Sequence, residues 1–284
     1  MLQATLKDAV YAEGVGAHSG DFCDITIMPA SEDFGVIFVR GDLDEDCYVK
    51  ANYANIEETP LCTRLSNKTN FSVSTVEHLL AALYGIGVSN AFVQSNGGEI
   101  PMLDGSSIQF VEKVLNVGVK EQSSRRKILK ITETVRVEED SSWVSLSPAE
   151  SFSINIECDY TKHGLMTSPL SFNFATGDFV KEIAPARTFG FFADAEFLRK
   201  NNLARGVSLE NALVFGEHGY LINDKKLRFH DEAMRHKILD VIGDLSLSGC
   251  LIQGRFDGFR PSHRINHLLL RAVFKSFDNY TFNQ

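Results

Sequence analysis

Residues 231–247 (DEAMRHKILDVIGDLSL) place His236, Asp240 and Asp244 four residues apart. In an α-helix each side chain lies only ~40° around the axis from the one before, so the three form a row along one face. A histidine and an aspartate at positions i and i+4 can bind the same metal ion, as two histidines do in HExxH helices. An apolar stripe at helical spacing forms the opposite face: Met234, Ile238, Val241, Ile242 and Leu245.

The same row is also typical of the solvated face of an amphipathic helix, and spacing alone does not separate these two interpretations. Two details favour a metal-binding face over a merely solvated one. Lys237 adds a cation beside the row, and Gly243 interrupts a good helical segment without any capping role.

A second pair that can do chemistry is Glu77-His78, in the segment 72–84 (SVSTVEHLLAALY). Neighbours on a helix point ~100° apart, so the two side chains do not easily bind one ion together. The histidine can instead bind the metal, while the glutamate acts as a base for water at the open coordination position. Standing alone, such a dipeptide is also a common surface feature.

Together, His78, His236 and Asp240 offer two imidazole nitrogens and one carboxylate oxygen. This set suits a catalytic zinc ion whose fourth position holds water. The hypothesis requires two helices far apart in the sequence to face each other, which spacing cannot establish. A protein without metal, in which the Asp240 row is merely solvated, is the competing interpretation.

Strands and helices along the chain must position these residues. Short β-branched segments bounded by Gly, Pro and Asp predict strands at 24–28, 35–40 and 91–94. Helices are predicted at 72–84, with Ser and Thr residues as cap candidates and glycines after its end, and at 107–115. The short polar segment 121–127 (EQSSRRK) is the best candidate for a domain boundary.

Beyond that segment the order of strands and then helices returns. Strands are predicted at 128–131, 134–138, 142–146 and 153–157, and helices at 192–199, 231–247 and 263–275. This order predicts an α+β fold with two similarly built domains, at residues 1–124 and 125–284. The first would contribute Glu77 and His78, and the second His236 and Asp240.

Composition excludes several classes of protein. The chain has 284 residues, 44% of them hydrophobic, with a formal net charge of −9, so bulk charge gives a nucleic-acid partner no support. Its five cysteines are scattered and never form a CxxC pair, which argues against a disulfide framework and a thiolate zinc site. No secretory signal is evident and no apolar run approaches the ~20 residues of a membrane span. We therefore expect a protein of the cytoplasm.

Other candidate features favour ordinary structural roles. The loop 14–20 (GVGAHSG) lacks the GKS/T ending and the GxGxxG spacing of phosphate-binding loops, which favours a turn between strands. Four histidines have no evident partners and are expected on the surface or in the core: His163, His218, His230 and His267. Core packing explains most of the 21 phenylalanines.

A series of short motifs occurs in a specific order along nearly the whole chain: 14–20 (GVGAHSG), 74–83 (STVEHLLAAL), 99–106 (EIPMLDGS), 186–191 (ARTFGF), Asp231-Glu232, 235–244 (RHKILDVIGD) and Ser262-His263. In this order and spacing the chain resembles the UDP-3-O-acyl-N-acetylglucosamine deacetylases, zinc enzymes of the committed step of lipid A biosynthesis. The resemblance implies two two-layer α/β sandwich domains, each with a small insert, and an active site between them.

Matched residue by residue, the resemblance implies that His78, His236 and Asp240 are the zinc ligands. It implies that Glu77 is the general base and His263 the histidine that assists the leaving amine. It implies that Asp244 orients that histidine and that the Thr188 hydroxyl stabilises the oxyanion. It also implies that Lys237 and Phe189 contact the substrate. Cys62 and His18 match positions that line or neighbour the pocket.

The implied reaction is hydrolysis of the N-acetyl group of a UDP-linked 3-O-(3-hydroxyacyl) amino sugar, with release of acetate. Zinc lowers the pKa of its bound water towards about 7, and Glu77 takes the proton as the hydroxide attacks. A cationic His263 then protonates the amine, which is otherwise a poor leaving group. Fe²⁺ is the alternative metal in the cell. We expect a monomer that acts on this small molecule and has no nucleic-acid partner or transmembrane segment.

Two segments depart from the family pattern. Residues 161–164 read TKHG where an Asn-His-Pro turn is usual, and 203–206 read LARG where a double glycine is common. Both departures leave the metal chemistry unchanged and make the acyl-chain length an open question. Two further alternatives are a deacetylase of another N-acetylated sugar or amide, and a non-catalytic binding protein on the same scaffold. Retention of the whole candidate set argues against the second.

Overall fold

The computed structural model describes residues 1–41, 47–69 and 71–283. Its largest elements are two five-stranded sheets, one in each half of the chain. The first has the order β2-β3-β9-β4-β5 and is formed by β2 (Val10–Val15), β3 (Phe22–Pro29), β9 (Ala91–Ser95), β4 (Val36–Arg40) and β5 (Tyr48–Lys50). Alternate residues of β3 are buried, as expected for a strand with one face on a core.

The second sheet has the order β12-β13-β19-β14-β15. It is formed by β12 (Val135–Glu139), β13 (Ser142–Ser147), β19 (Arg255–Phe259), β14 (Ser153–Glu157) and β15 (Leu170–Asn173). In both sheets the third strand is parallel to the fourth, and every other neighbouring pair is antiparallel. The two halves are therefore built alike, which confirms the predicted α+β fold with two similar parts.

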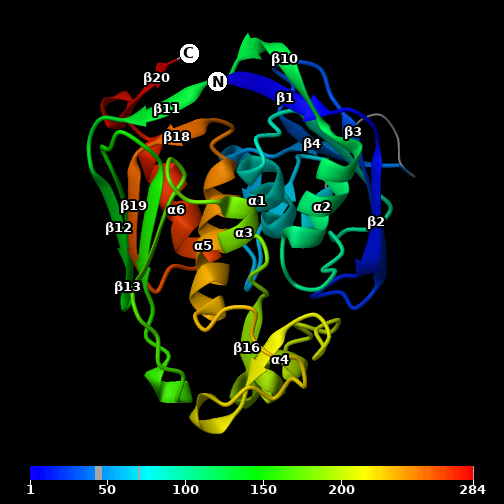
Figure 1. Ribbon diagram of the computed structural model, residues 1–284, viewed down its shortest axis with the longest axis vertical. Coiled ribbons are helices and arrows are strands. Elements are labelled where there is room, and N and C mark those ends of the chain that lie inside the picture. The colour runs from blue at the N-terminus through cyan, green and yellow to red at the C-terminus, as the bar shows by residue number, and fades with distance from the viewer. Residues whose placement is uncertain (42–46, 70, 284) are drawn as a thin grey trace.

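The main helices lie between the two sheets, so that the layers run sheet, helices, helices, sheet (Figure 1). The first half supplies α1 (Glu77–Gly85) and α2 (Ile108–Val117), and the second half supplies α5 (Glu232–Ser246) and α6 (His263–Val273). Helix α1 packs on α5, and α5 packs on α6. One apolar core runs through both halves, because residues of all four helices and both sheets belong to the same buried cluster.

Each half carries an insert before its central helix. In the first half this is the sheet of β6 (Ile56–Glu57), β7 (Arg64–Ser66) and β8 (Ser72–Ser74). In the second half, residues between β15 and α5 form α3 (Phe179–Glu182), β16 (Phe189–Phe191), α4 (Ala195–Lys200) and β17 (Leu213–Phe215). The part with β16 and α4 extends beyond the sandwich at one end of the molecule (Figure 1).

Smaller strands join the halves at the other end, near both chain termini (Figure 1). There β1 (Leu2–Leu6) pairs with β10 (Val119–Arg125), and β11 (Ile128–Ile131) lies between β18 (Leu251–Gln253) and β20 (Tyr280–Asn283). The segment 121–127, the candidate domain boundary, is therefore mostly strand. Its polar residues alternate in exposure because β10 has one face in solvent.

Most predicted elements are confirmed within a few residues, and two differ. The helix predicted at 72–84 begins only at Glu77, because residues 72–74 form strand β8 and Thr75 has a positive φ of 59°. The helix predicted at 192–199 is a 3₁₀ turn, Phe192–Asp194, followed by α4. In the part of the chain that the structure describes, no helix combines the length and apolar character needed to cross a bilayer.

Candidate metal and catalytic centre

The centre forms where α1 crosses α5, and Gly243 allows this close approach. A Cβ atom built on Gly243 would lie 2.2 Å from the backbone oxygen of Glu77, which is far inside van der Waals contact. The glycine that interrupts the α5 sequence is therefore explained by packing. It brings the first turn of α1, with Glu77 and His78, against the middle of α5.

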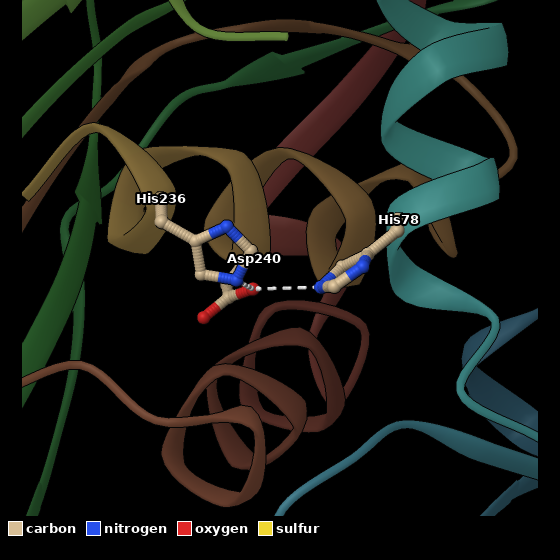
Figure 2. Close-up of side chains that lie close together, drawn as sticks. All are labelled: His78, His236 and Asp240. Atoms are coloured by element: carbon tan, nitrogen blue, oxygen red, sulfur yellow. Dashed lines mark ion pairs between the residues drawn. The ribbon is translucent and has the colours of Figure 1, made fainter. Parts of the chain in front are cut away.

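Three side chains meet at this crossing: His78 from α1, and His236 and Asp240 from α5 (Figure 2). Asp240 Oδ1 lies 3.3 Å from His236 Nε2 and 3.8 Å from His78 Nε2. All three residues are buried, and one ligand atom from each lies within 4.8 Å of the others. The interpretation of the row on α5 as a solvated face is therefore wrong, because α1 covers it.

The donor atoms of this cluster are ready for a divalent cation. His236 Nδ1 lies 3.0 Å from the carbonyl oxygen of Ala186, which leaves Nε2 directed to the cluster. Asp240 Oδ2 accepts a hydrogen bond from Lys237 Nζ at 2.7 Å, whereas Oδ1 is buried without any hydrogen-bond partner among the described residues. A buried carboxylate oxygen without a partner is costly, and a bound cation removes that cost. The cluster therefore fits a metal ion.

The protonation states of the cluster also suit metal binding. Burial, and after it the neighbouring His236, lowers the pKa of His78 to about 3. Burial likewise lowers the pKa of His236. Burial raises the pKa of Asp240, but Lys237 and the histidines outweigh this, and the net pKa lies below its usual value. At neutral pH the site thus offers two neutral imidazoles and one carboxylate, the forms that bind metals.

Glu77 is a buried carboxylic acid beside this cluster. Its Oε2 accepts the backbone N–H of Thr63 at 3.0 Å, and its Oε1 lies 3.7 Å from His263 Nε2. Burial raises its pKa to about 7, with Asp244 and Asp240 adding to the rise and His263 opposing it. A carboxylate that changes charge near neutral pH can accept a proton and release it again.

His263, the first residue of α6, is held by Asp244 of α5. Its Nδ1 lies 2.9 Å from Asp244 Oδ2, so that Nε2 faces Glu77. Burial lowers the pKa of His263, but Asp244 and then Glu77 outweigh this and raise it to about 9. The pKa of Asp244 lies well below its usual range, because His263 and His267 outweigh the effect of burial. At neutral pH the pair is an imidazolium and a carboxylate.

Three residues missed at the sequence level complete the shell around Asp244. Thr63 Oγ1 donates to Asp244 Oδ1 at 2.5 Å, and Asn266 Nδ2 donates to Oδ2 at 2.8 Å. His267, expected to have no partner, lies with its Nε2 3.4 Å from Asp244 Oδ1 and 3.0 Å from Thr63 Oγ1. Its position four residues after His263 was a usable signal, because the two histidines share one face of α6.

A cavity of about 1620 Å³ opens over the centre. Its floor includes Glu77, His78 and His263. One part of its wall is apolar and comes largely from the second insert: Phe189, Phe191, Phe192, Phe197, Leu203, Val207, Ala212, Val214 and Ile222. A charged wall is formed by Glu58, Arg264 and Arg271, which ion pairs join, and Lys237 also lines the cavity. A ligand with one polar and one long apolar portion matches this division.

The remaining candidate residues lie in or beside this cavity. Thr188, Phe189, Lys237 and His18 line it. Cys62 is buried and is not one of the lining residues; its Sγ lies 3.6 Å from Thr59 Oγ1. Burial, and after it the nearby Glu77, raises the pKa of Cys62 to about 12, so the thiol is neutral.

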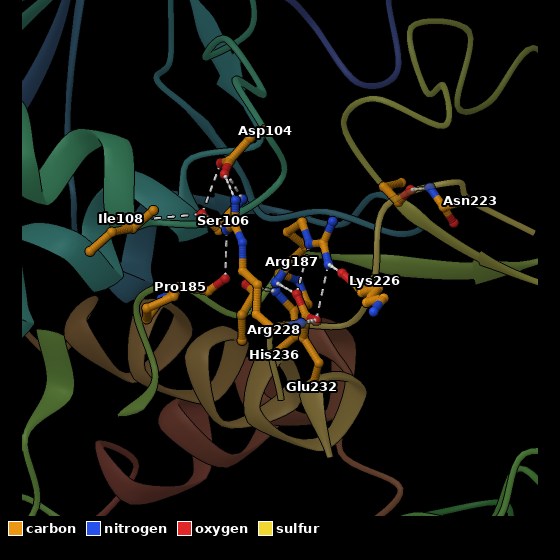
Figure 3. Close-up of polar contacts among 12 residues, drawn as sticks. Asp104, Ser106, Ile108, Pro185, Arg187, Asn223, Lys226, Arg228, Glu232 and His236 are labelled. Atoms are coloured by element: carbon orange, nitrogen blue, oxygen red, sulfur yellow. Dashed lines mark hydrogen bonds and ion pairs between the residues drawn. The ribbon is translucent and has the colours of Figure 1, made fainter. Parts of the chain in front are cut away.

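Thr188 follows Arg187, which belongs to a network of polar contacts that includes Glu232 and His236 (Figure 3). The position of Thr188 is also fixed directly. Its backbone N–H donates to the Gly105 carbonyl at 2.7 Å. The preceding residue, Arg187, makes a buried ion pair with Glu232 at 2.8 Å, and its backbone N–H donates to the same carboxylate at 3.1 Å. Since Glu232 begins α5 and His236 lies one turn later, this network ties Thr188 to the helix that carries two of the clustered residues.

The two halves also meet across the second insert. The Gly206 N–H donates to the Ala17 carbonyl at 3.0 Å, and a Cβ on Gly206 would lie 2.1 Å from the Gly16 oxygen. The Ala204 N–H reaches His18 Nδ1 at 3.4 Å. The atypical segment 203–206 therefore packs on the glycine-rich loop 14–20, which is a turn after β2, as expected.

The other atypical segment, 161–164, borders the apolar wall. It forms a 3₁₀ turn, Thr161–His163, that ends at Gly164 with φ of 76°. The His163 ring stacks on Phe191 with centroids 3.8 Å apart. His163 therefore has an aromatic partner, contrary to the sequence-level expectation, whereas His230 is exposed as expected.

Known proteins resemble this chain along nearly its full length. Residues 3–275 match the model of a family described as UDP-3-O-acyl N-acetylglycosamine deacetylase. A UDP-3-O-acyl-N-acetylglucosamine deacetylase from Colwellia psychrerythraea is 42% identical over 281 residues, which cover 98% of this chain and 92% of the relative. Proteins with the same name from Shewanella sp. strain W3-18-1 and Shewanella oneidensis are 42% and 41% identical over 280 residues, each covering 98% of this chain and 91% of the relative.

Proposed function

The chain belongs to the UDP-3-O-acyl N-acetylglycosamine deacetylase family, and on that premise we propose that it hydrolyses the N-acetyl group of UDP-3-O-(3-hydroxyacyl)-N-acetylglucosamine. The products are acetate and the free amine, in the committed step of lipid A biosynthesis. One observation carries the proposal: a single cavity is lined by the His78, His236 and Asp240 cluster together with Glu77 and His263, and the buried Asp244 holds His263 in place.

The resident metal is Zn²⁺, bound by His78, His236 and Asp240, with Fe²⁺ as the alternative in the cell. Two imidazole nitrogens and one carboxylate oxygen are a typical donor set for catalytic zinc. When bound, the ion supplies Lewis acidity and lowers the pKa of a water ligand towards about 7. Lys237 holds Asp240 Oδ2 at 2.7 Å, which leaves Oδ1 for the metal.

Glu77 is the general base. Its carboxylate is buried at the cavity floor, and the Thr63 N–H fixes Oε2, which leaves Oε1 to take a proton from the attacking water. A general base of this kind typically contributes 10²–10⁴-fold to the rate. The pKa near 7 means that a substantial fraction of Glu77 is ionised at neutral pH.

His263 is the general acid for the leaving amine. Asp244 holds Nδ1 and keeps the ring cationic, because it and Glu77 raise the pKa of His263 to about 9. Nε2 therefore carries the proton that is donated to the amine nitrogen as the carbon–nitrogen bond breaks. The 3.7 Å between Nε2 and Glu77 Oε1 brings acid and base to neighbouring sides of the scissile amide.

The remaining residues bind the substrate. The Thr188 hydroxyl donates to the oxygen of the tetrahedral intermediate, and Lys237 and Phe189 contact the sugar end. The apolar wall of the second insert takes the 3-hydroxyacyl chain, and the charged wall takes the UDP portion. His18 lines the pocket next to the segment 203–206, and Cys62 neighbours the base from beneath the cavity.

We further propose that the protein acts in the cytoplasm as a monomer, with domains at residues 1–124 and 125–284. The boundary is supported by the matching order of the two five-stranded sheets and by the end of β10 at Arg125. Each domain contributes part of the centre, so neither domain alone can complete the metal cluster.

The test is a deacetylation assay on the UDP-linked acyl sugar and on N-acetylglucosamine, with metal content measured in parallel. Wild-type protein is expected to release acetate from the UDP-linked substrate and to act poorly on the simple sugar. Glu77→Ala should keep its metal and lose turnover, whereas His236→Ala should lose both. Near-normal turnover in metal-loaded Glu77→Ala would show that another group is the base, and equal rates on both substrates would refute the substrate assignment.

A further inference from the structure

A second cavity, of about 210 Å³, lies at the other ends of the two central helices. It is lined by the last turn of α1, by the residues that follow α5, and by Arg126, between β10 and β11. Of the residues that line it, none lines the catalytic cavity. We propose that this second cavity binds a small oxyanion, a phosphate or a carboxylate, with the Arg126 guanidinium as its principal contact.

Arg126 is buried without a counter-charge. It is only 7% exposed, and among the described residues no carboxylate pairs with its side chain. Its contacts are Met1 Sδ, 4.0 Å from Nη1, and the face of the Tyr84 ring, 5.8 Å from the guanidinium carbon. The other buried guanidinium described above, that of Arg187, pairs with Glu232. A buried charge without such a partner is costly, and a bound anion removes the cost.

The surroundings of Arg126 supply no hidden anion. Burial lowers the pKa of its guanidinium, and the groups that oppose this effect are Tyr84 and Cys250. Burial raises the pKa of Tyr84 to about 12 and also raises that of Cys250, so both are neutral at physiological pH. The carboxyl ends of α1 and α5 each contribute about half an elementary negative charge. Two lysines at the rim of the cavity, Lys50 and Lys127, offset this charge.

The rim of the second cavity adds further positive charge. Lys50 and Lys127 line it and are exposed, and Asp33 is the one carboxylate among its described lining residues. Asp33 already accepts a hydrogen bond from Gln3 Nε2 at 2.7 Å. Three cations therefore face one carboxylate and two helix carboxyl ends, and the remaining positive charge favours an anion.

The size and the donor geometry define the ligand class. The cavity is smaller than the ~300–1,000 Å³ typical of pockets that bind drug-sized ligands, so it suits a single small oxyanion better than a nucleotide. The planar fork of an arginine binds phosphate and carboxylate oxygens through two parallel hydrogen bonds. Asn52 accepts the Ala54 N–H with its Oδ1, so its side-chain amide group is a further donor at the rim.

The site is tested by thermal unfolding of the metal-loaded protein with inorganic phosphate, with malonate and with chloride at matched ionic strength. An anion at one hundred times its Kd raises the unfolding midpoint of wild type by about 5 °C. Arg126→Met removes the charge at similar length and is expected to lose most of this shift. Arg125→Met, an exposed neighbour on β10, is the matched control and should keep it. Protection by phosphate alone or malonate alone identifies which oxyanion the site prefers.

Anion binding at the catalytic centre would stabilise wild type and Arg126→Met equally. Equal shifts of the unfolding midpoint in the two proteins therefore overturn the proposal. The absence of any shift in wild type also overturns it. A second measurement does not depend on any variant. A wild-type crystal soaked in tungstate, a heavy tetrahedral oxyanion, should give an anomalous peak against the Arg126 guanidinium. Tungstate bound elsewhere with no peak in this cavity would refute the site.

Discussion

Asp244→Asn removes one charge from the centre while nearly preserving its shape. Asp244 is fully buried and receives hydrogen bonds from Thr63 Oγ1 and Asn266 Nδ2, as well as contacting His263. The asparagine oxygen can still accept from Thr63. Its amide group faces that of Asn266, which leaves a buried donor without an acceptor and costs ~1–3 kcal/mol of stability.

The main effect is on the protonation of His263. Asp244 is the strongest influence that raises the pKa of His263 to about 9, against burial, which lowers it. Without that charge the pKa falls towards its ordinary value of 6.5, a loss of about 3 kcal/mol of interaction with the imidazolium. With a pKa of 6.5, only about a tenth of His263 is cationic at a pH of about 7.5. The rate at that pH should fall at least about tenfold.

The assay is the pH dependence of kcat/KM. In wild type the rate should rise as Glu77 ionises, with a pKa of about 7 that a neighbouring metal ion lowers further, and fall as His263 loses its proton near pH 9. In Asp244→Asn the alkaline fall should move to lower pH by one to two units or more. Thr63→Val removes a hydrogen bond to Asp244 but keeps the charge, so its alkaline limb should stay close to that of wild type.

An alkaline limb that is unchanged in Asp244→Asn, with metal content at the wild-type level, would refute the reasoning. It would mean that the group titrating near pH 9 is not His263, or that Asp244 does not control its charge. Thermal unfolding midpoints, measured on the same proteins, distinguish a loss of the fold from a loss of His263 as the general acid.

Three further predictions follow from the same geometry. Thr188→Val keeps the shape of the side chain and removes its hydroxyl, so kcat should fall about 10²–10³-fold with little change in KM, as measured in steady-state kinetics. Gly243→Ala places a Cβ 2.2 Å from the backbone oxygen of Glu77, so it should lower the free energy of unfolding by ~1–3 kcal/mol and weaken metal binding. Gly98→Ala is the control, because its Cβ would meet nothing within 4 Å, and it should have neither effect. Ala212→Leu narrows the apolar wall and should raise KM for a long-chain substrate but not for a short-chain one; equal effects on both would mean that the chain lies elsewhere.

Spacing on one helix predicted the row of His236, Asp240 and Asp244, but not its surroundings. Periodicity determines which residues share a face, and says nothing about which element covers that face. The cover is α1, and it fits because Gly243 lacks a side chain. A contact between elements so far apart in sequence leaves no trace in local pattern, so the bare spacing could not decide between a solvated face and a metal site.

The start of α1 was misplaced for a similar reason. Thr75 adopts a positive φ, and its hydroxyl donates to Glu99 Oε1 at 2.7 Å. Glu99 also accepts the N–H groups of His18 and Ser19. The strained turn before Glu77 is therefore held by a distant carboxylate, which propensity cannot anticipate.

Thr63 shows the limit of motif reading. It belongs to no recognisable pattern, yet its N–H binds Glu77 and its hydroxyl binds Asp244. His267 was detectable, because it follows His263 at the same four-residue spacing that revealed His236 and Asp240. Residues that act through the fold, such as Thr63, become visible only once the two halves are assembled.

The central claim is that one metal ion is bound jointly by the two halves of the chain. Anomalous diffraction at the zinc edge, from crystals of wild-type protein purified without chelators, tests it most directly. The account predicts one strong peak within bonding distance of His78 Nε2, His236 Nε2 and Asp240 Oδ1. Crystals with no peak at this cluster after zinc is supplied, or with zinc bound only at other residues, would contradict it.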